Sequence, residues 1–252
     1  MRRRKGIDRM DGVLVIDKPA GLTSHDVVVR VKRTLGAGKV GHLGTLDPAA
    51  TGVLPLVIDR ATRHADLLSG GRKEYLATMK LGTETDTYDA EGRVTATGET
   101  ASLSVEDVER ALKSFVGRIS QVPPMFSAVK KNGVPLYKLA RKGIEVEREP
   151  KEVEIFSVDV VEIGIPLAVF RLACSRGTYL RTICFDAGRV LGCGAHLAAL
   201  ERTRSGRFSM EDAIALDSSR QLMEESIMPL ASLVDHAPGG RTGFKETVTA
   251  HG

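Results

Sequence analysis

Alternating apolar and polar positions predict β-strands in this chain, and the clearest run is Lys73–Leu81. Tyr75 and Met79 fall on one face of this run, whereas Thr78 falls on the other. A repeat of two residues is typical of a strand that buries one of its faces. We therefore expect Tyr75 near the beginning of a strand.

Apolar runs elsewhere extend the expected sheet. Residues 12–16 form a short β-rich stretch, and residues 153–161 and 167–173 read as two strands paired around a turn at residues 164–166. The stretch CSRGTYLRTI that follows combines the end of a strand, a glycine turn and the start of a helix. This arrangement projects Tyr179 and Arg181 from the rim of the sheet, where they can meet residues of another loop.

Capping residues mark the expected helices. Thr23 or Ser24 begins a helix that runs through about residue 35, after a turn on Pro19 and Gly21. Ser104 caps a second helix over residues 104–116, which carries an apolar stripe. Shorter helical stretches are expected at residues 210–215 and 222–228, and residues 236–252, rich in turn formers, are expected to be loose.

One short loop places polar residues and glycines before an apolar run, in the stretch GHLGTLDPAATGVLPL. By spacing alone Asp47 is a helix N-cap, because aspartate accepts backbone N–H bonds there and Pro48 suits the first helical position. Gly41 and Gly44 bracket the loop, however, and glycine is used where backbone bends sharply or approaches a ligand. A capping aspartate needs no such neighbours, so a second role stays open for Asp47.

Composition narrows the class of protein. The chain has 252 residues, of which 42% are hydrophobic and 27% charged, and this suits one sizeable globular domain with an appendage. A net charge of +4 and a pI near 9.0 permit a nucleic-acid partner. No apolar stretch approaches a membrane span, and the three cysteines have no CxxC spacing. We expect a soluble protein of the reducing cytosol, with cysteines in or near the core.

Several motifs favour chemistry by side chains alone. The six histidines show no metal-ligand spacing, GAGKVG lacks the arrangement of a phosphate loop, and the acidic turn at residues 86–91 lacks the pattern of a calcium loop. We therefore expect no metal site. The stretch QVPPMFSAVKKNGVPLYKLARKG is either a solvated face or a contact for a phosphate backbone, because its basic residues are interleaved with Phe126 and Tyr137.

Five motifs in order resemble the bacterial tRNA pseudouridine-55 synthases, the TruB family. They are GVLVIDKPAGLTSHDVV, VGHLGTLDPAATGVLPL, KEYLATMKLGTETDTYDAEG, QVPPMFSAVKKNGVPLYKLARKG, and CSRGTYLRTI followed by GAHLAALERTRSGRF. The resemblance covers about residues 12–208. It implies an α/β fold of the α+β type, in which a central mixed, mainly antiparallel sheet is flanked by helices and carries an RNA-binding cleft.

The resemblance also implies roles for the residues that match the family's motifs. Asp47 matches the catalytic aspartate, and a capping role for it can coexist, since a helix start is a rigid mount. Arg181 matches the arginine that pairs with this aspartate. Tyr75 matches the tyrosine that stacks on the target base and acts in proton transfer. Tyr179 matches a second pocket tyrosine, and Leu200 matches the apolar contact beneath the base.

Further matches concern binding of the RNA. His42 matches the residue that wedges into the space left by a flipped nucleotide, and Arg63 in DRATR is expected to contact phosphate. Lys18 belongs to a first motif that we expect to be mainly structural, supporting the loop. Read without the family, each of these residues is an ordinary core, rim or surface residue.

The implied reaction detaches uracil from ribose, turns it and rejoins it through a ring carbon. This isomerisation changes no oxidation state and has no second substrate, so we expect no cofactor. Asp47 either attacks the sugar or ring covalently or takes a sugar proton in a glycal-type path, and the sequence leaves both routes open. We expect a monomer that binds the T arm of tRNA, contacts no membrane, and isomerises uridine 55.

Two alternatives belong to other classes. An RNA chaperone of the same fold opens and refolds tRNA without turnover, and a carbohydrate hydrolase needs two acids at a characteristic separation. Only Asp47 lies in suitable surroundings for the second, because the acidic turn at residues 86–91 has no evident partner arginine.

We expect a catalytic domain over residues 1–208, a short helical extension over 209–235 that falls short of the family's C-terminal RNA-binding module, and a flexible tail. Glu201, beside Leu200, stands where a basic residue is expected.

Overall fold

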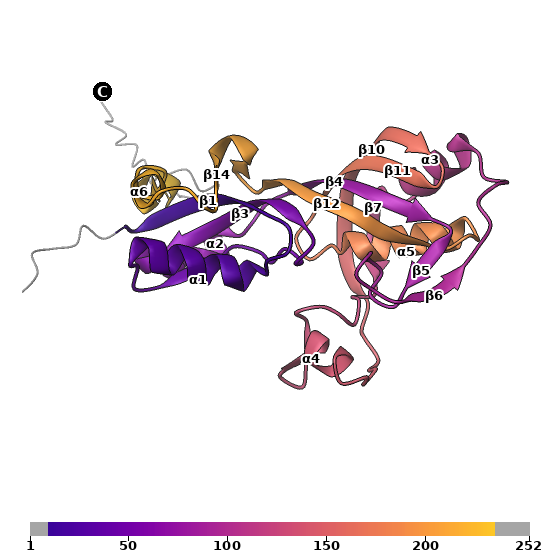
Figure 1. The fold of residues 1–252 in the computed structure, drawn as a ribbon, viewed down its shortest axis with the longest axis horizontal. Helices are drawn as coiled ribbons and strands as arrows, with labels where there is room; N and C mark the ends of the chain where they lie inside the picture. The colour runs from indigo at the N-terminus through magenta and orange to yellow at the C-terminus, as the bar shows by residue number, and fades with distance from the viewer. Residues whose placement is uncertain (1–9, 235–252) are drawn as a thin grey trace, which may run out of the picture.

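The computed structural model describes residues 10–234, so the tail expected at 236–252 lies outside the described residues. An eleven-stranded mixed sheet runs through the described chain in the order β14-β1-β3-β12-β4-β11-β10-β7, with β2, β13 and β15 pairing at its margins (Figure 1). Its strands are β1 Gly12–Lys18, β2 Val40–His42, β3 Thr51–Ile58, β4 Lys73–Leu81, β7 Gly117–Gln121, β10 Lys151–Gly164, β11 Leu167–Cys174, β12 Ala195–Ser205, β13 Phe208–Ser209, β14 Ala213–Ala215 and β15 Met228–Pro229.

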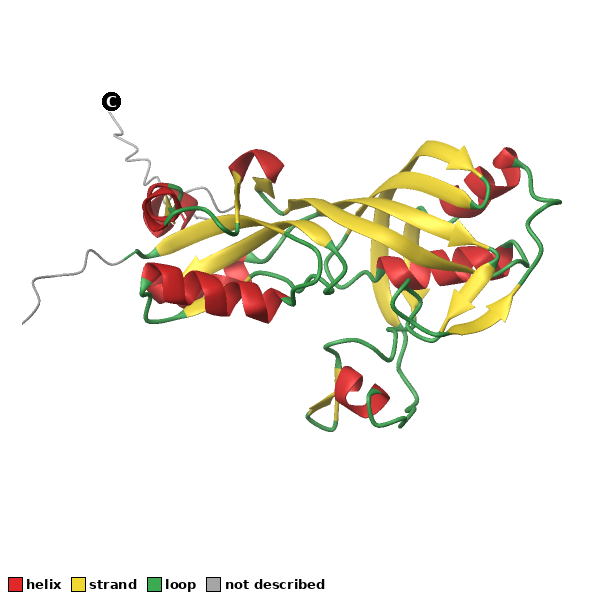
Figure 2. Cartoon of the chain, in the orientation of Figure 1, coloured by secondary structure: helices red, strands yellow, loops and turns green. Residues whose placement is uncertain are grey.

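Helices and two small hairpins complete the fold (Figure 2). The hairpins pair β5 Thr83–Thr85 with β6 Val94–Thr97, and β8 Lys130–Lys131 with β9 Val134–Pro135. The helices are α1 Ser24–Leu35, η1 Asp59–His64, α2 Ala65–Leu68, α3 Val105–Lys113, α4 Leu136–Ala140, α5 Leu180–Val190, η2 Met210–Asp212, α6 Arg220–Glu225 and α7 Leu230–Val234. No helix of residues 10–234 is long and apolar enough to cross a membrane.

Strand β12 joins the two halves of the sheet. It pairs antiparallel with β4 along most of its length, whereas its parallel pairing with β3 is limited to Glu201 and Arg202. One half carries β1, β3 and α1, and the other carries β4, β11, β10 and β7 together with α5 (Figure 1). The short contact between β3 and β12 is therefore the place where the two halves meet.

Glycine makes that contact possible. Gly52 has a φ of +95°, and a Cβ at this position would lie 2.4 Å from the carbonyl oxygen of Arg202. L side chains avoid positive φ, and no other residue brings backbones so close. The glycine in ATGVLPL thus sets how closely the first half approaches β12.

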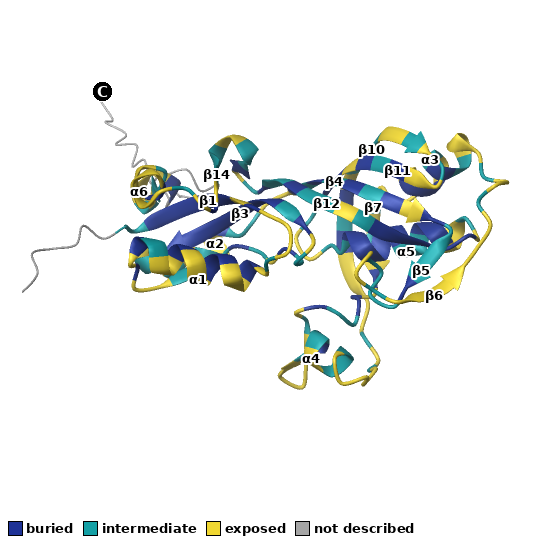
Figure 3. Ribbon diagram, viewed as in Figure 1, coloured by how far each residue is buried: buried dark blue, intermediate teal, exposed yellow. Residues whose placement is uncertain are grey.

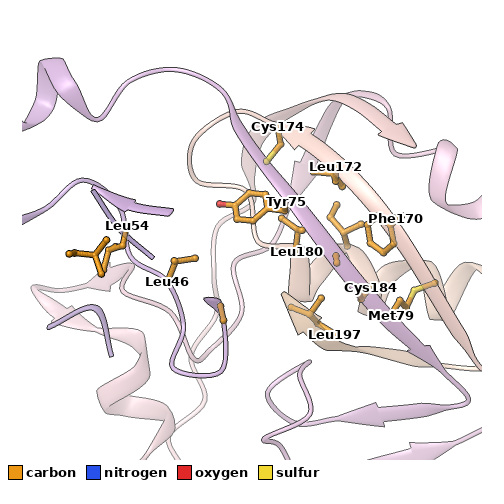
Figure 4. Close-up of a cluster of buried hydrophobic side chains, with 14 of the residues drawn as sticks. Leu46, Leu54, Tyr75, Met79, Phe170, Leu172, Cys174, Leu180, Cys184 and Leu197 are labelled. Carbon is orange, nitrogen blue, oxygen red and sulfur yellow. The ribbon is translucent and has the colours of Figure 1, made fainter. Parts of the chain in front are cut away.

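The larger of two buried clusters contains residues of both halves, and Figure 3 shows buried segments in each half. Leu46 and Leu54 belong to the same cluster as Phe170 and Leu172, and Figure 4 shows Tyr75 lying between these two groups. Cys174, Cys184 and Cys193 are free and buried, which confirms the expectation that they are core residues. Because α5 packs apolar side chains under the sheet, its first turn has a fixed position relative to the strands.

Most predicted elements are confirmed. The strand Lys73–Leu81 and the paired strands β10 and β11 are present, and α1 begins at an N-cap, Thr23, whose side chain forms a capping box with Asp26. The second helix has the predicted cap at Ser104. The sheet is mainly antiparallel, as expected, with parallel pairing only at β1–β14 and β3–β12 among the described strands.

Two helix predictions are wrong. Residues 47–50 form a single turn, closed by a bond from the Ala50 N–H to the Asp47 carbonyl, because β3 begins at Thr51 and leaves no room for a helix. Residues 210–215 form one 3₁₀ turn followed by β14, which pairs with β1. Six residues are too few for periodicity to distinguish a helix from a strand.

Candidate active site

A bidentate ion pair lies at the junction of the two halves. In Arg181, the second residue of α5, Nε lies 2.9 Å from Asp47 Oδ2 and Nη2 donates to Asp47 Oδ1 at 3.3 Å. The Arg181 side chain is 4% exposed, whereas that of Asp47 is 39% exposed. A guanidinium fork fixes both the orientation and the ionised state of a carboxylate. Asp47 is therefore held in place while one side of it stays open to solvent.

Arg181 is itself held by two other segments, the acidic turn at residues 86–91 and the loop that carries Phe126. Its Nη1 lies 3.6 Å from Asp89 Oδ2 and donates to the Thr87 carbonyl at 3.2 Å, while Nη2 donates to the Phe126 carbonyl at 2.8 Å. The acidic turn was expected to have no partner arginine, and this expectation is wrong. Tyr88 adopts a φ of +64° and stacks on a residue of α5, which turns the Thr87 carbonyl toward the guanidinium.

Buried bonds fix the turn that carries Asp47. Lys18 is fully buried, and its Nζ donates to the carbonyls of Ala50 at 2.6 Å and Pro48 at 3.0 Å. Ser24 accepts from the Leu46 N–H at 2.8 Å and donates back to its carbonyl. The expected structural role of Lys18 is confirmed. Burial lowers its pKa to about 8, which the negative charge of Asp47 partly offsets.

Burial also raises the pKa of Asp47 above the ordinary carboxyl value. The charge and hydrogen bonds of Arg181 oppose this shift, and the charge of Asp89 adds to it. Desolvation favours the neutral acid, whereas the guanidinium favours the carboxylate. Asp47 is thus a carboxylate placed where its negative charge is poorly solvated, a condition that makes a carboxylate a better nucleophile or base.

A small pocket opens beside this carboxylate. Its volume is about 30 Å³, and it is lined by Asp47, Ala49, Ala50, Asp89, Ala90, Arg181, Leu197, Ala198, Ala199 and Leu200. This volume is enough for roughly one water molecule. A larger planar group enters only when the lining side chains move apart. The pocket is apolar on the β12 side and charged on the Asp47 side.

Two tyrosines lie near the ion pair. Tyr75 on β4 is 9% exposed, and burial raises the pKa of its phenol, an effect that the adjacent Arg202 opposes. Tyr179 is the N-cap of α5 and is partly exposed. The buried Gln121 clamps its backbone, because it accepts from the Tyr179 N–H at 2.8 Å and donates to the Tyr179 carbonyl at 3.1 Å. Both phenols stay neutral at physiological pH, since burial raises the pKa of Tyr179 too.

Comparison with known proteins places this geometry in a family. The model of the TruB family pseudouridylate synthase N-terminal domain matches residues 32–180, and that of the tRNA pseudouridylate synthase B C-terminal domain matches residues 181–235. The chain belongs to the TruB family. A protein named tRNA pseudouridine synthase B from Geobacter sulfurreducens is 54% identical over 85% of this chain and 71% of its own length. A protein of the same name from Geotalea uraniireducens is 50% identical over 89% of this chain and 74% of its own length.

Solved structures agree with the TruB assignment. A chain of a Cbf5-Nop10-Gar1 complex superposes with a TM-score of 0.70 and 32% identity, over 90% of this chain and 62% of that chain. A chain of an H/ACA RNP bound to a substrate RNA containing 2'-deoxyuridine gives a TM-score of 0.67 and 29% identity, over 92% of this chain and 64% of that chain. The pseudouridine synthase fold expected from the motifs is therefore confirmed.

The TruB fold brings together most of the predicted site residues. Asp47, Arg181 and Leu200 line one pocket. Tyr75 and Tyr179 lie close enough for the charge of Asp47 to affect their phenols. These residues come from a turn, a helix and two strands, so no single stretch of sequence forms the site.

Two predicted residues lie apart from this pocket. Arg63, on η1, lines a separate open groove of about 570 Å³ together with Lys39 and Arg60, beyond the far end of β3. His42 ends β2, opposite Leu56, and its Nδ1 is buried without a hydrogen-bond partner. Burial, the charge of Arg202 and that of a second histidine lower the pKa of His42, so it is neutral at physiological pH.

Sequence reasoning missed three residues of the site. Asp89 reads as a turn residue, because its partner Arg181 is far away in sequence. Gln121 reads as the start of a proline-rich loop. Arg202 is 2% exposed, so it does not replace the basic residue expected at position 201 for contact with RNA. No alternation in residues 195–205 marks Arg202, because buried positions there fall at residues 195–197, 202 and 205.

Proposed function

We propose that this TruB-family chain is a tRNA pseudouridine synthase that isomerises uridine 55 in the T arm, with Asp47 as its essential carboxylate. The Asp47–Arg181 pair at the mouth of the pocket carries the proposal. Proteins of the same name with about half of their residues identical support it. The reaction moves a base on one nucleotide, so one oriented carboxylate and a pocket for the base meet its chemical demands.

Asp47 acts in its ionised form. As a nucleophile it forms a bond to the sugar or the ring, and as a base it takes a sugar proton, and both routes need a free oxygen lone pair. Arg181 keeps the carboxylate charged and aimed, and Asp89 holds the other edge of the guanidinium. Because the Asp47 side chain is partly exposed, a flipped nucleotide reaches it without displacing Arg181.

Apolar and aromatic side chains receive the base. Leu200 supplies an apolar surface in the pocket, Tyr75 stacks on the uracil and exchanges a proton as a neutral phenol, and Tyr179 closes the other side. Flipping the nucleotide out of the tRNA loop costs a few kcal/mol. His42 occupies the vacated position as a neutral ring, which favours stacking among bases over contact with phosphate.

Basic surfaces bind the RNA backbone. Residues 122–150 form a protrusion around α4 that stands away from the sheet and carries Lys130, Lys138 and Arg141 on its surface (Figure 1). Arg63 in the open groove is a further phosphate contact. Positive charge on two separate surfaces suits a folded RNA arm that reaches beyond the pocket.

Tritium release tests the proposal. Purified protein is incubated with tRNA that contains uridine labelled with tritium at C5, without added metal or cofactor, and we expect release that equals one uridine per tRNA. Chemical tagging of pseudouridine followed by mass analysis places the product at position 55. A pure RNA chaperone leaves no product, and absence of both signals contradicts the proposal.

A further inference from the structure

Arg202 is a buried cation without an anionic partner. Its side chain is 2% exposed, and no carboxylate among residues 10–234 lies within ion-pair distance of it. Burying an unpaired charge is costly, so its neighbours must supply hydrogen bonds in place of water. An apolar side chain at this position of β12 would pack without the free-energy cost of desolvating a charge.

The acceptors of Arg202 lie on both sides of the Asp47 turn. Nε donates to the Val53 carbonyl at 2.8 Å, Nη2 to the Gly44 carbonyl at 3.1 Å, and Nη1 to the Thr45 carbonyl at 3.3 Å. Gly44 and Thr45 precede the aspartate and Val53 follows it. One guanidinium thus closes the loop in which Asp47 is mounted.

The same guanidinium faces Tyr75. Arg202 and Tyr75 are directly paired across β12 and β4, so their side chains share one face of the sheet. In Figure 4 the hydroxyl of Tyr75 points away from Phe170 and toward the part of the chain that carries Leu46. The positive charge of Arg202 lowers the pKa of that phenol, against the larger effect of burial. Arg202 is therefore in contact with the mounts of two predicted catalytic side chains.

We propose that Arg202 is a positioning residue of the pseudouridine synthase site, which ties the Gly44–Thr45 turn to the phenol of Tyr75. The inference rests on the proposed function of Asp47 and Tyr75. Its physical basis is that the guanidinium bonds a turn in one half of the sheet and lies beside Tyr75 on a strand of the other half. Loss of the bridge lets the carboxylate and the phenol move relative to each other.

Three variants test this role. Arg202→Met removes every polar contact at similar length, and Arg202→Lys keeps the charge but reaches fewer carbonyls. Arg204→Met is the matched control, because Arg204 lies on the same strand and its ion pair is with the partly exposed Glu74, at 3.7 Å. Each protein is measured with a T-arm hairpin for single-turnover rate at saturating RNA, for RNA affinity, and for folded fraction in urea.

Displacement of reacting groups by about 1 Å costs roughly 100-fold in rate, and we expect a loss of that size for Arg202→Met. We expect about 10-fold for Arg202→Lys and a rate within about twofold of the parent for Arg204→Met. RNA affinity should change by less than about threefold in the Arg202 variants, since they touch no RNA-binding surface. If Arg202→Met does not fold, Arg202→Lys carries the test.

Coupling to Tyr75 separates positioning from general stability. The loss caused by Arg202→Lys should be much smaller in a Tyr75→Phe background, because the bridge then has no hydroxyl to hold. Amide hydrogen exchange over residues 43–50 should be faster in Arg202→Lys and unchanged in Arg204→Met. The inference is overturned if folded Arg202→Lys reacts at the parent rate. It is also overturned if the rate losses of Arg202→Lys and Tyr75→Phe multiply in the double variant, or if amide exchange over residues 43–50 is the same in Arg202→Lys as in the parent. If the parent protein itself is inactive, the proposed function is contradicted. The role of Arg202 is then still tested by amide exchange over residues 43–50.

Discussion

Asp47 is subject to two opposing electrostatic effects. Burial makes its carboxylate harder to ionise, and Arg181 makes it easier, with burial the larger effect. Because the folded-state pKa is raised, the folded protein binds a proton more readily than the unfolded chain. The contribution of Asp47 to stability is therefore present at low pH and lost as pH rises through its folded pKa. At neutral pH the site holds a carboxylate that does not stabilise the fold.

Asp47→Asn should abolish pseudouridine formation and leave the fold intact. The amide is a poor nucleophile and cannot act as a base, whereas its shape preserves the turn. We expect the free energy of unfolding to change by no more than about 1 kcal/mol. Tritium release, urea unfolding and RNA binding on the same preparation check this. Conversion near the parent rate, with deamidation excluded by mass, would refute a catalytic role for Asp47.

Substitutions of the two charged neighbours of Asp47 should shift the acidic limb of the pH–rate profile in opposite directions. Asp89→Asn removes a negative charge that raises the pKa of Asp47, so the limb should move to lower pH. Arg181→Met removes the cation that lowers it, so the limb should move to higher pH. The parent limb should lie above the ordinary carboxyl range. Single-turnover rates between pH 4 and pH 8 give the midpoints, and shifts of the same sign in both variants would contradict the assignment.

At the scale of elements, the close approach of β3 to β12 depends on one glycine. Gly52→Ala adds a Cβ 2.4 Å from the Arg202 carbonyl oxygen at a φ of +95°. We expect a loss of about 2 kcal/mol or more in unfolding free energy, from strain and displaced backbone together.

Gly192→Ala is the matched control, because its φ is +73° and no heavy atom lies within 4 Å of the added Cβ. Backbone conformation alone should then cost about 1 to 2 kcal/mol. Urea unfolding of both variants measures the difference. An equal loss in the two would show that contact with β12 contributes nothing.

The protrusion around α4 should affect binding more than chemistry. Replacing Lys138 and Arg141 by Gln should weaken tRNA binding and reduce the slope of log affinity against log salt by up to about 2. The single-turnover rate at saturating tRNA should hold, since neither residue contacts the pocket. The control is Lys113→Gln on α3, whose ammonium pairs with Glu109 at 2.5 Å. Filter binding across a salt series measures the slope, and an unchanged slope would place the RNA elsewhere.

Sequence patterns predicted the elements better than the contacts between them. The alternation around Tyr75 and the capping box at Thr23 are local, so spacing alone predicts them. The helix predicted after Pro48 failed because local capping rules do not include the pairing of residues 51–58 with β1 and β12. Asp89 and Arg202 were missed for the same reason: each is ordinary in sequence and acquires its role only from a partner in another segment. Motifs predicted Asp47 and Arg181, and only the fold shows their geometry.

The whole described molecule should unfold as one unit. A single sheet spans both halves, and one cluster of buried side chains is continuous between them. We expect peptides from β1 and β3 to lose exchange protection at the same urea concentration as peptides from β10 and β11. Hydrogen exchange read by mass spectrometry gives both midpoints. Separate midpoints would show that the short parallel contact of β12 does not couple the halves.

Strand β12 has a central place in the sheet and a late place in the sequence. Its neighbours β3 and β4 end at Ile58 and Leu81, whereas β12 begins at Ala195. A ribosome makes the chain from its N-terminus, so the edge of β4 that pairs with β12 stays open to solvent until residues 195–205 emerge, whereas β2 already pairs with residues 56–58 of β3. Open strand edges are templates for aggregation. Synthesis arrested before Ala195 therefore leaves this β4 edge open to aggregation, and the pocket is completed only when β12 has been made.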